Sequence, residues 1–140
     1  MIPVNFWAVL VSAVAAMFIG WLWFGPLFRS QWVASLGMSD ARMQEMMRKG
    51  MAMSYVVMFI GALLMAFVLA HAIIFAEAYL GMTGVSAGLA VAFASWIGFV
   101  APATVGGVLW EGKSWNWWFI TAGYHLVLLL VMGVILALWV

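Results

Sequence analysis

The sequence has no cysteine among its 140 residues and very few charged side chains. The absence of cysteine excludes disulfide bonds, thiolate nucleophiles and cysteine metal ligands. Charged residues make up 6% of the chain, against about a quarter in soluble domains, so polar groups cannot cover a surface exposed to water. A formal net charge of +1 leaves no basic patch of the kind that binds nucleic acid. We therefore expect no nucleic-acid partner.

Acidic side chains are scarce in the same way. The four of them, Asp40, Glu45, Glu77 and Glu111, fall at the ends of apolar runs or between them. This placement offers no buried carboxylate pair for general acid–base catalysis. HExxH, GxSxG, P-loop and dinucleotide-binding motifs do not occur either. We expect a protein that is not an enzyme and that uses no metal and no cofactor.

Four long apolar runs are what the sequence does contain, at residues 4–24, 53–76, 85–109 and 116–140. Each is long enough to cross a hydrocarbon core, which takes about 20 helical residues. The apolar residues are continuous rather than alternating, which favours helices over barrel strands. The predicted fold is an all-α integral membrane protein, a four-transmembrane-helix bundle that forms a single domain over residues 1–140.

A short amphipathic helix is predicted between the first two runs, at residues 40–49, with Ser39 as its N-cap. Its methionines, Met43, Met46 and Met47, recur on one face, and we place the helix at the membrane interface. Thioethers also bind cuprous copper. Because no cysteine or histidine lies nearby, we interpret these methionines as packing residues rather than metal ligands.

The basic residues predict the topology. All five lie in the connections after the first and third runs, whereas the connection at residues 79–84 has none; they are Arg29, Arg42, Arg48, Lys49 and Lys113. The positive-inside rule places those two connections in the cytoplasm. We therefore expect a multi-pass protein of the cytoplasmic (inner) membrane with both termini outside.

Small residues recur every four positions in two of the runs. The rows are Ala62, Ala66 and Ala70; Gly84, Gly88 and Ala92; and Ala94, Gly98, Pro102 and Gly106. Such spacing lets membrane helices approach closely. Two interpretations stay open: close packing within one subunit, or the interface of a homo-oligomer.

His125 is the main candidate for function, because an ionisable group inside a membrane segment is costly to keep there. Counting along the runs brings Pro102 and Gly61 to a similar depth, with Ser95, Thr104 and Tyr124 in range. Pro102 deprives the carbonyl of Gly98 of its usual donor, which His125 is placed to supply. Either His125 is a neutral packing residue, or it accepts protons or binds a ligand in a pocket open to the cytoplasm.

His71 lies too far from His125 along the predicted bundle for a shared metal site. Asn5 lies at the same level as His71, near the outer surface. We predict that the two form a polar pair that caps the outer end of the bundle.

Two stretches resemble the conserved regions of the domain of unknown function 1761 family. The first runs from Gly20 to Phe28, with Trp32 after it, and is similar to the family signature Gly-x-x-Trp-Tyr-Gly-Pro-x-Phe; its matching residues are Gly20, Trp23, Gly25, Pro26, Phe28 and Trp32. The second comprises residues 98–102 and 123–125. Phe24 stands where the family usually has tyrosine. The resemblance implies a small bacterial multi-pass membrane protein without an assigned activity, and it draws attention to Trp23, Pro26, Pro102 and His125.

Two hypotheses for function follow. In the first, the protein is a small transporter or channel-like binding protein with its pocket around His125, for a small molecule or ion not identified by the sequence. In the second, it is a structural or accessory subunit of a membrane complex that acts through helix packing. The lipid bilayer is the expected partner in both, together with further copies of the chain where it self-associates.

Overall fold

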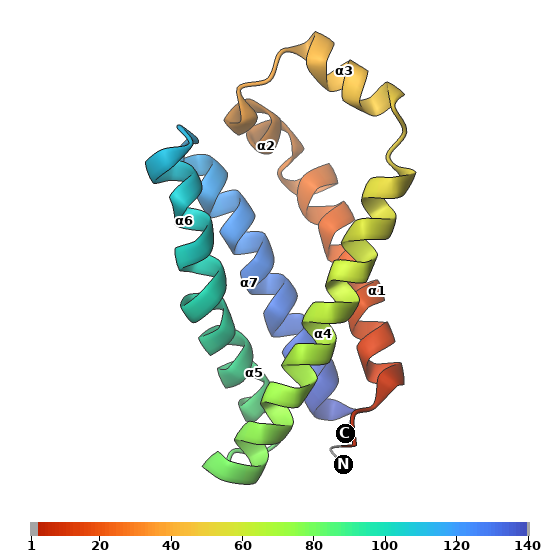
Figure 1. Ribbon diagram of the computed structural model, residues 1–140, viewed down its shortest axis with the longest axis vertical. Helices are drawn as coiled ribbons and strands as arrows, with labels where there is room; N and C mark the ends of the chain where they lie inside the picture. Colours follow the sequence, from red (N-terminus) through yellow and green to blue (C-terminus); the bar gives the residue numbers. More distant parts are fainter. Residues whose placement is uncertain (1–2, 140) are drawn as a thin grey trace.

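The computed structural model describes residues 3–139, and every regular element in that range is a helix (Figure 1). In chain order the elements are α1 (Phe6–Leu22), the π-helical turn η1 (Trp23–Leu27), α2 (Arg29–Leu36), α3 (Asp40–Arg48), α4 (Ala52–Leu80), α5 (Gly84–Ser95), the π-helical turn η2 (Trp96–Val100), α6 (Ala101–Trp110) and α7 (Trp115–Leu138).

Four continuous segments are long and apolar enough to cross a membrane: Phe6–Leu27, Ala52–Leu80, Gly84–Trp110 and Trp115–Leu138. The predicted all-α fold, with four helices of membrane length and composition, is confirmed. The second segment continues to Leu80, four residues past its predicted end, and stops at Gly81, whose φ of 68° is accessible to glycine. The predicted amphipathic helix is α3, where the Ser39 hydroxyl accepts a bond from the Arg42 amide at 3.3 Å.

Helix α7 is the central element, since it packs against α1, α2, α4, α5 and α6. The chain termini and the α4–α5 turn lie at one end of the bundle, named here the terminal end (Figure 1). Helices α2 and α3 and the α6–α7 turn lie at the other, named the basic end because it carries all five lysines and arginines. The two connections that contain the basic residues in the sequence therefore lie at the same end of the bundle.

Alanine and glycine dominate the buried core and let the helices approach closely. The row Ala62, Ala66 and Ala70 is buried in the bundle, as are Gly88 and Ala92. At the crossing of α5 and α7, a Cβ built on Gly133 would lie 2.5 Å from the Gly88 carbonyl oxygen. For these residues, packing within one subunit is the arrangement found. Gly84 is different: it is exposed and begins α5 with a φ of 60°.

Pro26 and Pro102 lie in and just after the two π-helical turns. In η1 the Phe28 amide donates to the Trp23 carbonyl at 3.0 Å, five residues back. In η2 the Ala101 amide donates to Trp96 in the same way. A wide turn accommodates the proline ring and its missing N–H without ending the helix. The first helical segment therefore continues through Pro26 to Leu27, past residue 24, the predicted end of its apolar run.

Candidate functional site

Two tryptophans from different helices bind the backbone of α7. The Trp23 indole donates to the Ile120 carbonyl at 2.9 Å, and the Trp96 indole donates to the Ala122 carbonyl at 2.8 Å. A helix carbonyl keeps a second lone pair for such a donor. We name Trp23, Trp96 and their two acceptors the tryptophan clasp. It joins the segments before α2 and before α6 to adjacent points of α7.

Each tryptophan of the clasp is the first residue of a π-helical turn and is followed two residues later by glycine, in Trp23-Phe24-Gly25 and Trp96-Ile97-Gly98. A widened turn rotates the preceding side chains relative to a regular helix, and such turns recur at functional sites. The sequence analysis missed this correspondence. The signal was the Trp-x-Gly triplet ahead of each proline.

The first stretch that resembles the family motifs packs against residues 123–125 of the second. The Phe24 ring meets Tyr124 edge-on at 4.9 Å between ring centroids and lies 5.0 Å from Trp32. A Cβ built on Gly20 would lie 3.1 Å from the Tyr124 hydroxyl oxygen, and one on Gly123 would lie 3.4 Å from the Trp23 ring. Both glycines therefore make room for an aromatic ring from the other stretch. Phe28 completes the cluster, 4.7 Å from Trp23.

His125 is half-buried, and its partner differs from the predicted one. Its Nδ1 lies 2.8 Å from the carbonyl of Thr121, within α7, and its ring is 5.0 Å from Tyr124. Gly98 and Pro102 are exposed on the outside of the bundle. The predicted bond to the Gly98 carbonyl is therefore replaced by a bond to the carbonyl four residues back in the same helix, which is in reach without any contact between helices.

Ser95 and Thr104, also predicted around His125, form hydrogen bonds elsewhere. The Ser95 hydroxyl donates to Val91 at 2.8 Å, and that of Thr104 donates to Val100 at 2.7 Å, each within its own helix. Thr104 also accepts the Trp118 indole N–H at 3.1 Å. Gly61 is half-buried, and a Cβ built on it meets nothing within 4 Å. Tyr124 is the member of this group that the bundle buries.

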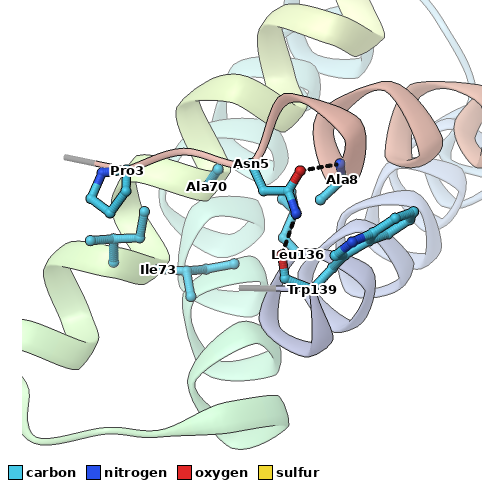
Figure 2. A pocket seen from close by; sticks show the side chains of 8 residues that line it. Pro3, Asn5, Ala8, Ala70, Ile73, Leu136 and Trp139 are labelled. Carbon is cyan, nitrogen blue, oxygen red and sulfur yellow. Dashed lines mark hydrogen bonds between the residues drawn. The ribbon is translucent and has the colours of Figure 1, made fainter.

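Asn5 and His71 also have separate partners. The Asn5 side chain caps α1 by accepting from the Trp7 and Ala8 amides, and it donates to the Trp139 carbonyl at 3.0 Å (Figure 2). His71 Nδ1 lies 2.8 Å from the Phe67 carbonyl of its own helix. Asn5 thus joins the two ends of the chain. Its side chain bonds to Trp7, Ala8 and Trp139 and not to His71, the partner predicted for it. A cavity of about 20 Å³ beside Asn5 has room for about one water molecule.

A much larger hollow, widely open to its surroundings, lies at the basic end, with a volume of about 700 Å³. We name it the interfacial cavity; it is lined by Gly25, Pro26, Leu27, Arg29, Ser30, Val33, Ala34, Gly37, Met38 and Asp40. These residues belong to η1, to α2, to the connection that follows α2 and, for Asp40, to the start of α3. Gly37 ends α2 with a φ of 64°, which turns the chain back toward the cavity.

The interfacial cavity contains two charges of opposite sign, on Arg29 and Asp40. Within residues 3–139 the ion pair found is Lys113 with Glu111 at 3.8 Å, so Arg29 and Asp40 do not pair with each other. Along the sequence, Arg29 indicated only topology and Asp40 only an acid in a connection. Their spacing did not indicate that both line one cavity, because this depends on the turn at Gly37.

In the part of the chain that the structure describes, no group of three or more histidine, aspartate or glutamate side chains gathers as candidate metal ligands.

Comparison with known proteins gives one match. The family model described as protein of unknown function DUF1761 matches residues 7–137. No curated protein and no solved structure matches the chain. The match covers the four membrane-length segments except Phe6 and Leu138, and it includes the residues of the aromatic cluster. The chain belongs to the DUF1761 family.

Proposed function

We propose that this protein is a multi-pass membrane protein that acts by binding, and that its binding site is the interfacial cavity. The observation that carries the proposal is the volume of that cavity, about 700 Å³, within the range of roughly 300–1,000 Å³ typical of ligand sites. Neither this cavity nor the small one beside Asn5 is lined by His125. The geometry therefore favours the basic end over the pocket predicted around His125.

The protein then remains in the class of small transporters or channel-like binding proteins, with a defined orientation in the membrane. The basic end faces the cytoplasm, because lysine and arginine are retained on that side of bacterial inner membranes. A ligand then enters from the cytoplasm or from the inner leaflet, since the cavity adjoins Leu27, the last residue of the first membrane-length segment. His125, bonded to its own helix and packed beside Tyr124, has a structural role in this account.

A thermal-shift screen with a plugged variant tests the binding function. Ala34 is exposed on α2 and lines the cavity, so Ala34→Trp fills it without disturbing the core. The probes are a panel of phospholipids and a panel of water-soluble metabolites, added to the detergent-solubilised protein. A ligand at 100 times its Kd stabilises by about 2.7 kcal/mol. We expect at least one compound to raise the Tm of the wild type and not that of the plugged variant.

Ala41→Trp is the matched control, because Ala41 is exposed on α3 and does not line the cavity. The control should keep the full response. A panel in which every stabilising compound acts equally on the wild type and on both variants would contradict binding in this cavity.

A second candidate is an accessory subunit that self-associates, and one observation favours it. Ala90, Ala94, Gly98 and Pro102 are exposed along the outside of α5, η2 and α6, unlike the small residues buried within the bundle. Pro102 also has no N–H to donate to the Gly98 carbonyl, which leaves that acceptor available to a neighbour. This row, named here the outer small-residue row, is where close approach of another helix costs least.

A further inference from the structure

The interfacial cavity lies at the level where a bilayer changes from hydrocarbon to headgroups. Leu27 closes the first membrane-length segment, and Arg29 to Asp40 continue beyond it at the basic end (Figure 1). A ligand in this cavity therefore has access to lipid on one side and to water on the other. This inference rests on the proposed function, since it names the ligand of the same site.

The lining of the cavity is divided by chemistry. Leu27, Val33 and Met38 offer apolar surface, and Leu27 is exposed over 57% of its area. Arg29 and Asp40 supply one positive and one negative charge, with no ion pair between them among residues 3–139. The two charges balance within the cavity, so it favours a ligand whose own charges balance and are held on separate groups.

A guanidinium binds phosphate through two parallel hydrogen bonds, and a carboxylate accepts hydrogen bonds from a primary ammonium. We propose that the interfacial cavity binds the headgroup of a zwitterionic phospholipid with a primary amine, as in phosphatidylethanolamine. Its phosphate binds Arg29, its ammonium binds Asp40, and the start of its acyl chains lies against Leu27. Phosphatidylglycerol has no cationic group for Asp40, and a quaternary ammonium has no N–H to donate to it.

Native mass spectrometry of the protein released from detergent micelles tests this assignment. Phosphatidylethanolamine, phosphatidylcholine and phosphatidylglycerol with identical acyl chains are added at equal concentrations, and the bound lipid is counted. Because the site is partly exposed, we expect the wild type to retain phosphatidylethanolamine over phosphatidylcholine by about fivefold, less than a buried charge-assisted bond would give. Asp40→Asn should abolish that preference, and Arg29→Gln should lower the retention of all three lipids.

Matched controls come from α3. Arg42→Gln and Glu45→Gln make the same changes of charge at exposed positions outside the cavity, and both should keep the wild-type preference. Asp40 begins α3, so circular dichroism checks the helix content of Asp40→Asn, and Asp40→Glu should restore the preference. If Asp40→Asn loses helix content, the lipid preference of the Asp40→Glu variant decides whether the carboxylate is the group that selects the lipid.

Equal retention of the ethanolamine and choline lipids by the wild type would overturn the assignment. The assignment would also be overturned if Arg42→Gln and Glu45→Gln changed lipid retention as much as the cavity variants do, because the effect would then come from surface charge alone. The proposed function fails separately. If a water-soluble compound stabilises the wild type but not Ala34→Trp, while no lipid is preferred, the cavity is a binding site and the lipid assignment is wrong.

Discussion

Trp23 and Trp96 show at the scale of single residues why the motif stretches contain tryptophan. Each ring supplies apolar surface within the bundle and one N–H, and each N–H reaches a carbonyl of α7. An indole donor that lacks a partner in a membrane-spanning bundle costs free energy, so the bond and the packing favour the same placement. Gly20 and Gly123 contribute by having no side chain where the aromatic rings lie.

Substitution of the clasp tryptophans by phenylalanine keeps an aromatic ring and removes the bond. We expect Trp23→Phe and Trp96→Phe each to lower the free energy of unfolding by about 0.6 kcal/mol, the average for a hydrogen bond between membrane helices, and by at most about 1.7 kcal/mol. The measurement is unfolding of the detergent-solubilised protein by SDS. Trp110→Phe is the control, because Trp110 is 87% exposed, and it should not change stability. Equal losses at all three positions would rule out a specific contribution from the clasp.

At the scale of the elements, the sequence predicts the existence and the limits of the four long helices well. Apolar length is a property of each run alone, and residues 85–109 and 116–140 differ by only a few positions from the observed Gly84–Trp110 and Trp115–Leu138. The rotation of each helix about its axis could not be predicted from the sequence, because it depends on which elements the helix packs against. Ala62 therefore lies inside and Ala94 outside, although both lie in rows with the same spacing.

The candidate site was harder to predict for the same reason. His125, His71, Ser95 and Thr104 all bond carbonyls of their own helices, three or four residues back, and such local bonds compete with the interhelical pairs that depth alone suggests. The interfacial cavity depends on the turn at Gly37 and on the π-helical turn at Pro26. Neither turn leaves a pattern of hydrophobicity in the sequence.

The outer small-residue row gives a prediction at the same scale. The natural chain has no cysteine, so Ala94→Cys introduces a single thiol on this face. If the row is a self-association surface, mild oxidation of membranes should link two copies through Cys–Cys bonds, and adding Gly98→Leu should reduce the yield by blocking close approach. Leu64→Cys, exposed on α4, is the control. Equal yields at both positions would indicate random collision rather than an interface.

At the scale of the whole molecule, the bundle separates two ends of different chemistry. The terminal end joins the two ends of the chain through Asn5 and has a cavity of water size. The basic end has all five lysines and arginines and the interfacial cavity. The small residues of the core hold the membrane-length helices together between them.

The central claim is that the interfacial cavity faces the cytoplasm and is open to water, and labelling of single cysteines tests it most directly. Ala34→Cys places a thiol in the cavity, and Tyr79→Cys places one on an exposed residue of the terminal end. With a membrane-impermeant thiol reagent, we predict that Tyr79→Cys reacts in intact bacterial cells, whereas Ala34→Cys reacts only after the membrane is permeabilised. Reaction of Ala34→Cys in intact cells, or its failure to react after permeabilisation, would contradict the account.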